Sequence, residues 1–398
     1  MQGGLRAPSQ TVVHSVRTTD RTDLLGFGSG NVDPAATVMS GAALESGSDM
    51  DHDQSSQSDA VLGVMELGFQ WQGLDPFIMT MHHMDHYPAG DDRQGPVQSL
   101  AGRQIGSDFS GSDGWSMYHG EHVPGFPQHP HRGFETVSVV RQGYIDHSDS
   151  LGATARYGGG DVQWLTTGSG IQHSEMFPLI NADEGNPLEL FQIWLNLPPE
   201  SKMVPAHFSM LWSEDIPTVE PVDGVSIDVI AGTLDGQVPP SAPPDSWASH
   251  DLGEMAIWLI RLEAGASWTI PAHVPGLNRM LHYFEGDSAV VGGVEIGSGV
   301  GAKLSSDVDA MIANGDSPSE FLLLQGRPIG APVFQLGPFV MNTPEELQQA
   351  FDDYRTTGFG GWPWSRTDPV HDRSEGRFAL HADGKVEHRD MQPATVEG

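Results

Sequence analysis

The chain of 398 residues contains no cysteine. Disulfide frameworks, zinc–thiolate centres and cysteine nucleophiles are therefore excluded. Any metal ion would have to be held by histidine, aspartate or glutamate side chains. The 18 histidines leave ample choice of nitrogen ligands.

Lysine is scarce, with only Lys202, Lys303 and Lys385, and the formal net charge is −34. Direct binding to nucleic-acid phosphate is disfavoured, because a binder normally carries the opposite charge. An acidic surface resists aggregation, and at high salt counterions screen its self-repulsion. We favour the salt-adapted, halophilic interpretation over that of an ordinary solvated surface.

Long apolar runs are also missing, since no segment approaches the 18 residues that a membrane-spanning helix needs. The first ten residues, MQGGLRAPSQ, have no apolar stretch behind their single arginine, which argues against a secretory signal. The sequence therefore predicts a soluble, cytoplasmic protein with no membrane partner.

Glycine (49 residues) and proline (29 residues) are plentiful and punctuate many short apolar segments. Such spacing is typical of all-β sandwiches and barrels rather than of alternating βα units. The expected organisation is a disordered acidic tail (1–58), an N-terminal metal-binding domain (59–197) with an insertion at 88–118, a connector (198–222), a metal-free C-terminal domain (223–365) and a C-terminal tail (366–398).

One helix is predicted over residues 343–357. Thr343 can cap it, Pro344 suits the first helical position, and Glu346 completes a capping box. Gly358 is expected to end the helix, which should dock on a sheet.

Two short segments carry the candidate chemistry. The first contains His129 and His131, and the second contains His173 and Glu175. Residues i and i+2 of a strand point to the same face, so each pair aims its two side chains in one direction. If the two strands face each other, three imidazoles and one carboxylate converge on a common point. This donor set suits iron, and also manganese, nickel, copper or cobalt.

Other titratable residues receive less specific interpretations. Glu135 follows His131 by four residues, so it is expected near the site, either as a fifth ligand or, as we favour, as a neighbour that accepts an imidazole N–H. His82, His83 and His86 could form an accessory metal site, although solvated loop histidines are the favoured interpretation. His147 is expected in a turn. His273 and His282 lack partners at ligand spacing.

The two segments, HPHRGFETV (129–137) and GDVQWLTTGSGIQHSEM (160–176), resemble those of the pirin family, which belongs to the bicupins. The resemblance resumes at LFQIWLNLP (190–198) and at FLLLQGRPIGAPVFQLGPFVMNTPEE (321–346). It implies two cupin-type β-barrels, with iron in the N-terminal one and no metal in the other. By this resemblance, the family's iron ligands correspond to His129, His131, His173 and Glu175. The insertion at 88–118 and the tail at 1–58 depart from typical members.

Three functions follow from these expectations. The first is a metal-dependent dioxygenase of the quercetin 2,3-dioxygenase kind, in which Glu175 is both ligand and proton acceptor for a small aromatic substrate. The second is a non-catalytic, redox-sensitive regulator that binds a protein partner. The third is a relic that binds metal without turnover, because cupin folds host several activities. We favour the dioxygenase.

Overall fold

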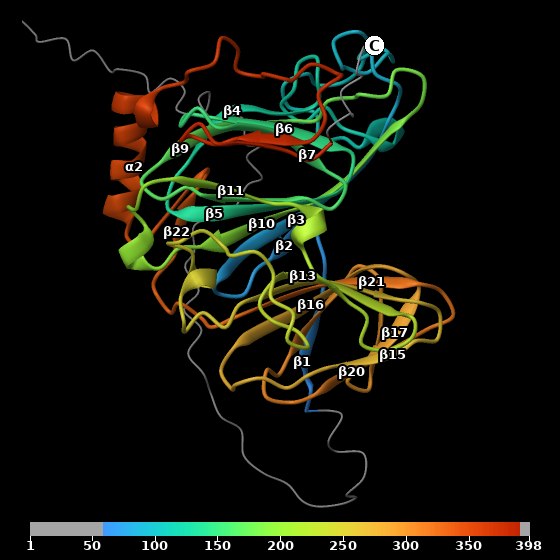
Figure 1. Ribbon diagram of the computed structural model, residues 1–398. Coiled ribbons are helices and arrows are strands. Elements are labelled where there is room, and N and C mark those ends of the chain that lie inside the picture. The colour runs from blue at the N-terminus through green and yellow to red at the C-terminus, as the bar shows by residue number, and fades with distance from the viewer. Residues whose placement is uncertain (1–58, 391–398) are drawn as a thin grey trace, which may run out of the picture. The chain divides into compact units, whose positions relative to one another are not determined.

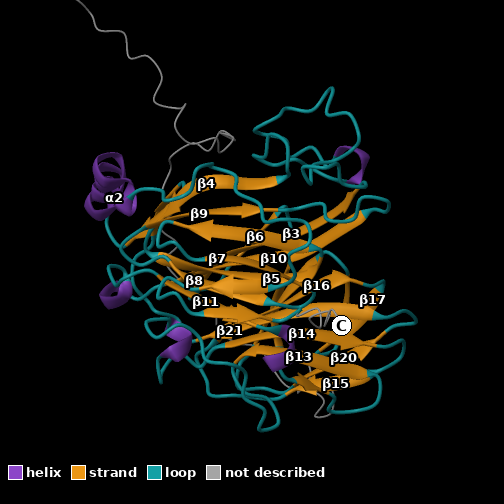
Figure 2. Cartoon of the chain, turned by 45° about the horizontal axis from the view of Figure 1, so that its top comes forward, coloured by secondary structure: helices purple, strands orange, loops and turns teal. Residues whose placement is uncertain are grey.

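The computed structural model describes residues 59–390, and within them the chain is built from β-strands in two lobes (Figures 1 and 2). The expected acidic tail at 1–58 lies outside the described residues. Each lobe contains two sheets, and a short hairpin lies apart from them. This arrangement confirms the all-β, two-cupin prediction.

The N-terminal lobe contains two six-stranded sheets. The first, in spatial order, is β11 (His207–Leu211), β8 (Val162–Thr166), β5 (Phe134–Gln142), β10 (Asn186–Asn196), β3 (Phe77–Tyr87) and β2 (Gln70–Gln72). The second is β25 (Val386–His388), β24 (Phe378–Leu380), β7 (Thr154–Gly158), β6 (Tyr144–Asp149), β9 (Ile171–Met176) and β4 (Gly125–His131).

The C-terminal lobe pairs a seven-stranded sheet with a four-stranded one. The larger sheet is β1 (Val61–Glu66), β19 (Val300–Leu304), β16 (Asn278–Glu285), β21 (Ser319–Gly326), β14 (Ala256–Leu262), β13 (Val225–Ala231) and β12 (Thr218–Val219). The smaller is β15 (Ser267–Ile270), β20 (Ala310–Asn314), β17 (Ser288–Val291) and β18 (Val294–Gly297), and the hairpin is β22 (Phe334–Leu336) with β23 (Phe339–Met341).

The two ends of the described chain are exchanged between the lobes. β1 pairs antiparallel with β19 in the C-terminal lobe, whereas β24 pairs with β7 in the N-terminal lobe. These pairings differ from the expected boundaries, which placed 61–66 in the first domain and 366–390 in a tail. The lobe to which an edge strand belongs depends on the strand with which it pairs. The order of residues along the chain does not show that partner.

The three largest apolar clusters form most of the core. One fills the C-terminal lobe, one fills the N-terminal lobe, and the third lies between the lobes. In the third cluster Val137 and Ile193 of the first lobe pack with Ile257 and Leu322 of the second. Strands β5, β10, β14 and β21 are therefore buried on both faces, which explains their nearly continuous apolar sequences.

The helix α2 (Pro344–Thr357) is confirmed at the expected position. The Thr343 hydroxyl accepts from the Glu346 backbone N–H, the Glu346 carboxylate accepts in return from the Thr343 N–H, and Gly358 closes the helix in a left-handed conformation. α2 is the single α-helix within residues 59–390, and it is neither long nor apolar enough to cross a bilayer. In Figure 1 it lies beside β9.

Candidate metal centre

The two histidine segments form neighbouring antiparallel strands, β4 and β9. His129 lies directly opposite His173 in the pairing register, and a bulge between Phe126 and His129 adjusts the register around them. Opposed residues of an antiparallel pair point to the same face. His131 is two residues further along β4 and shares that face. The side chains of each pair therefore alternate along their strands as the sequence predicts.

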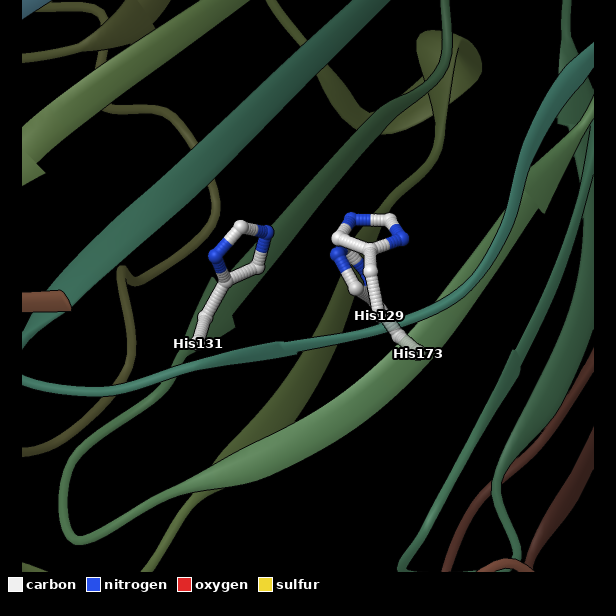
Figure 3. Close-up of side chains that lie close together, drawn as sticks. All are labelled: His129, His131 and His173. Atoms are coloured by element: carbon white, nitrogen blue, oxygen red, sulfur yellow. The ribbon is translucent and has the colours of Figure 1, made fainter. Parts of the chain in front are cut away.

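Three imidazoles converge at this point (Figure 3). One ring nitrogen from each of His129, His131 and His173 lies within 4.8 Å of the other two. The ring centroids are 4.4 Å apart for His129 and His173, and 4.8 to 4.9 Å apart for the other two pairs. Among the described residues this is the one group of three side chains that could hold a metal ion in this way.

Hydrogen bonds fix two of the three rings. His129 donates from Nδ1 to the Pro127 carbonyl oxygen at 2.8 Å, and His131 donates from Nδ1 to the Pro338 carbonyl oxygen at 3.3 Å. These bonds select the tautomer in which Nε2 carries a lone pair, which is the form a metal needs. Pro338 lies in the turn between β22 and β23, so residues far along the chain help to orient His131.

His173 is buried, with no exposed surface, and neither of its ring nitrogens has a hydrogen-bonding partner within the described structure. A buried polar nitrogen without a partner is costly, and a metal ion would satisfy one of the two. Burial also lowers the pKa of His129 to about 4 and holds the pKa values of His131 and His173 well below the ordinary value. All three rings are therefore neutral near pH 7, and the residues fit a metal ion.

Glu175 is two residues beyond His173 on the same face of β9. Its Oε2 lies 3.7 Å from His173 Nε2, and the Ser138 hydroxyl lies 3.1 Å from its Oε1. Gln192 Nε2 lies 3.5 Å from Oε2. Burial raises the pKa of the Glu175 carboxyl, whereas His147, Ser138 and Gln192 lower it. Glu175 thus lies beside His173 but outside the close group of three imidazoles, and its carboxylate is held from the opposite sheet by Ser138 of β5 and Gln192 of β10.

His147 is a neighbour of the site that the sequence interpretation missed. It was expected in a turn, but it lies inside β6, fully buried and opposite Glu175 in the register. Its ring is 5.5 Å from that of His173, and its Nε2 lies 3.2 Å from Asp149 Oδ2. The sequence signal that could have identified His147 as a strand residue was its alternating spacing with Ile145 and Asp149, since residues two apart on a strand share one face.

Glu135 lies elsewhere than expected. Its carboxylate accepts hydrogen bonds from Thr166 Oγ1 and Ser246 Oγ, both at 2.6 Å, and no imidazole of the three-histidine group is among these donors. Glu135 and Val137 lie on the same face of β5, and this face packs against the other lobe. Ser138 lies on the opposite face of β5. Glu135 was expected on the face of His131 because the two residues were placed on one continuous strand. The chain instead turns at Gly133, where φ is +84°, and β4 and β5 are separate strands.

The histidines near residue 83 are not loop residues. His82, His83 and His86 all lie in β3, and His83 is buried with its Nδ1 2.9 Å from the Tyr118 hydroxyl. Tyr118 belongs to residues 88–118, which were expected to be an insertion in the N-terminal domain. That segment contributes Trp115, Met117 and Tyr118 to the apolar cluster of the N-terminal lobe.

Two cavities of the described structure lie away from the three histidines. The larger, about 320 Å³, is between the lobes and has Arg141, Glu189, Asp228 and Arg261 among its lining residues. The smaller, about 130 Å³, is lined by residues around Phe177 and Leu188. Of the three histidines, His131 and His173 are buried and His129 is partly exposed.

Comparison with known proteins identifies the family. The Pirin family profile matches residues 66–195, and the profile of the Pirin C-terminal cupin domain matches residues 257–360. The chain is 38% identical over 242 residues to "Putative quercetin 2,3-dioxygenase" from Pseudomonas aeruginosa, an alignment covering 59% of this chain and 80% of that protein. It is 37% identical over 248 residues to Pirin-1 from Arabidopsis thaliana, covering 59% and 78%.

A crystal structure of quercetin 2,3-dioxygenase from Acinetobacter baumannii superposes with a TM-score of 0.61 at 26% identity. The superposition covers 76% of this chain and 98% of that chain. The first profile covers most strands of the N-terminal lobe and all three histidines, and the second covers most strands of the C-terminal lobe together with α2. The chain therefore belongs to the pirin family.

Proposed function

We propose that the protein is a metal-dependent dioxygenase that acts on a flavonol or a similar enolisable aromatic compound. One ion, most suitably Fe²⁺, would be held by His129, His131, His173 and Glu175. The observation that carries the proposal is the convergence of three neutral imidazoles on one face, with the Glu175 carboxylate oxygen 3.7 Å from His173 Nε2.

The donor set narrows the class of ion without selecting one. Imidazole and carboxylate ligands suit iron, and manganese, nickel, copper or cobalt are also compatible. Four protein ligands on an octahedral ion would leave two positions open, which a substrate needs. A structural zinc site is more often closed and tetrahedral.

The surroundings of Glu175 suit proton transfer. When bound, the ion would act as a Lewis acid that stabilises a deprotonated substrate oxygen. Glu175 would accept the substrate hydroxyl proton, because a carboxylate released from the ion can take up a proton, and burial, which raises the pKa of Glu175, favours the protonated form. Ser138 and Gln192 hold the carboxylate in place from the opposite sheet. The buried rings of His131 and His173 limit the access of water.

The relatives support the same reaction class. The Pseudomonas protein is named "Putative quercetin 2,3-dioxygenase", and the Acinetobacter structure is that of a quercetin 2,3-dioxygenase. The alignments reach at least 78% of the two curated relatives and 98% of the crystal structure, so the proposal draws on nearly whole proteins.

The test is oxygen uptake with quercetin by Fe²⁺-loaded protein, compared with metal-free protein. Glu175→Gln should lower the rate by about 10² to 10⁴-fold, the usual effect of losing a positioned general base. The matched control is Glu135→Gln, another buried glutamate, which should stay within about twofold of the wild type because it faces the other lobe. Undiminished turnover by metal-free protein would refute the proposal.

The burial of two ligand candidates favours a second candidate function, since His131 and His173 expose almost no surface to a substrate. A non-catalytic regulator would need no substrate entry, and the net charge of −34 would suit a basic protein partner. This candidate predicts capture of such a partner that depends on the metal and its oxidation state. Capture that is indifferent to both would exclude it.

A further inference from the structure

Each of the three histidines has a chain neighbour that is bonded to one late segment of the chain, residues 338–367. The neighbours are Gln128 before His129, Arg132 after His131 and Gln172 before His173. The segment contains β23, α2 and the short 3₁₀ turn Gly358–Gly360. It follows the strands of the C-terminal lobe in sequence, yet it packs on the strands that carry the three histidines (Figure 1).

Gln172 makes the densest set of these contacts. Its Nε2 donates to the carbonyl oxygens of Gly358 at 2.5 Å and Gly361 at 3.1 Å. Its Oε1 accepts from Gln128 Nε2 at 2.7 Å and from the Tyr354 hydroxyl at 3.3 Å. Gln172 is buried, and both its amide nitrogen and its amide oxygen are hydrogen-bonded.

Gln128 extends the connection to the other histidine strand. Besides its side-chain bond to Gln172, its backbone N–H donates to the Thr367 carbonyl oxygen at 2.6 Å. β4 and β9 are therefore joined on the outer face of the sheet by one glutamine pair, and both members of that pair are bonded to the late segment.

Arg132 makes the third connection. Its Nε donates to the Ser169 carbonyl oxygen and its NH1 to the Asp353 carboxylate, both at 2.7 Å. Its guanidinium lies over the Phe359 ring, 4.6 Å from the centroid. Phe359 also packs so closely on Gly170 that a Cβ there would come within 2.6 Å of the ring. α2 and the turn after it are thereby fixed against the loop that leads into β9.

We propose that residues 338–367 position the three-histidine site, acting through Gln172, Gln128 and Arg132 rather than by touching the ion. Adjacent residues of a strand point to opposite faces, so fixing the outward side chain of Gln172 fixes the rotation of the inward His173. The same reasoning joins Gln128 to His129. For His131 the link is direct, through the Pro338 carbonyl oxygen. The inference rests on the proposed metal site.

The test is the affinity of the purified full-length protein for Co²⁺, followed by its visible absorption spectrum. Gln172→Ala should raise the dissociation constant about tenfold, at the low end of what the loss of outer supports of metal ligands costs. It should also change the band shape, because the ring of His173 loses its orientation. Gln128→Ala should raise the dissociation constant severalfold.

Gln94→Ala is the matched control. Gln94 is also buried and also bonds to the C-terminal chain, donating from Nε2 to the His371 carbonyl oxygen at 2.7 Å, but it adjoins none of the three histidines. It should bind Co²⁺ within about twofold of the wild type. The comparison separates positioning of the ligands from general loosening of the C-terminal chain.

The outcomes are distinguishable. If wild-type protein binds no Co²⁺ at the three histidines, the metal site itself fails. If the wild type binds Co²⁺ and Gln172→Ala binds it equally well with the same spectrum, the positioning role is refuted. If Gln172→Ala does not fold, Gln128→Ala decides, because its side chain is half-buried and makes fewer bonds.

Discussion

His129 and His173 face each other across β4 and β9, with ring centroids 4.4 Å apart, although 43 residues of chain separate them. This pair defines the site: it brings together the two segments, and His131 and Glu175 follow from strand alternation. Neutral imidazoles can lie this close without charge repulsion, but no hydrogen bond joins the two rings. An ion bound between them would therefore stabilise ring nitrogens that otherwise lack a partner.

Ser138 is predicted to support the metal site from the opposite sheet. Its single hydroxyl proton can go either to Glu175 Oε1 at 3.1 Å or to Gln192 Oε1 at 2.6 Å, and the two acceptors share it. Ser138→Ala should weaken metal binding about tenfold, because Glu175 loses an orienting partner. Titration calorimetry with Fe²⁺ or Co²⁺ under anaerobic conditions measures this.

Ser148→Ala is the corresponding control. Ser148 is also buried, but it pairs with Ser174 and bonds to Thr154 on the other face of its sheet. Equal weakening by both substitutions would show that the effect is a general one of losing a buried hydroxyl, and the specific role of Ser138 would be abandoned.

The sequence predicted the residues of the metal site more accurately than it predicted the domain boundaries. The His-x-His and His-x-Glu spacings led to the three rings that the structure brings together, since parity holds within a strand. Parity failed for Glu135, because the turn at Gly133 separates two strands that look continuous in sequence. His83 and His147 were misjudged because nearby aspartates made buried strands look like solvated loops.

The exchange of β1 and β24 between the lobes could not be predicted at all. Both strands are short, and each pairs with a partner more than 200 residues away. Nothing in a six-residue apolar segment such as Val61–Glu66 specifies which sheet edge it completes. α2, by contrast, was fully specified locally by Thr343, Glu346 and Gly358.

Arg141 is predicted to hold the lobes together. Its guanidinium bonds to Glu189 of β10 and to Glu320 of β21, so that one side chain bridges the two lobes. Arg141→Met should lower the free energy of unfolding by about 1–3 kcal/mol, because Glu189 and Glu320 each lose one partner and keep only His82 and Arg261, respectively. Denaturant titration measures the loss.

Arg355→Ala provides the comparison for Arg141. Arg355 pairs with Asp352 on the exposed side of α2, and such surface pairs contribute less than about 0.5 kcal/mol. If Arg141→Met is no more destabilised than Arg355→Ala, the bridge is energetically unimportant and the apolar cluster alone joins the lobes.

Glu135 is predicted to make stability depend on pH. Burial between the lobes raises its pKa from the ordinary 4.5 to about 7, against the opposing hydrogen bonds from Ser246 and Thr166. The folded state therefore holds this proton more tightly than the unfolded chain, and its contribution to stability is complete below pH 4.5 and is lost as pH rises through 7. The gap corresponds to about 3 kcal/mol as an upper limit.

Glu135→Gln removes this titration and keeps the shape of the side chain. Between pH 5 and pH 8 the wild type should lose stability relative to the variant, and chemical denaturation at several pH values measures the difference. A constant difference across that range would mean that Glu135 is ionised in the folded state at pH 5 as well.

The net charge of −34 predicts stabilisation by salt. Raising KCl from 0.1 M to 2 M shortens the screening length from about 10 Å to about 2 Å, which suppresses repulsion among the acidic side chains. The melting temperature should rise by roughly 5 °C or more, equivalent to about 2 kcal/mol for a chain of this size. Sucrose is the non-ionic control, and an equal rise in sucrose would remove electrostatic screening as the cause.

The central claim is that one ion is shared by His129, His131, His173 and Glu175. Crystals grown from metal-loaded protein and measured at the absorption edge of the bound metal test it directly. The account predicts a single anomalous peak within bonding distance, about 2.0–2.2 Å, of the three imidazole nitrogens and a Glu175 oxygen. A peak at any other set of side chains, or an empty centre in protein shown to contain metal, would contradict it.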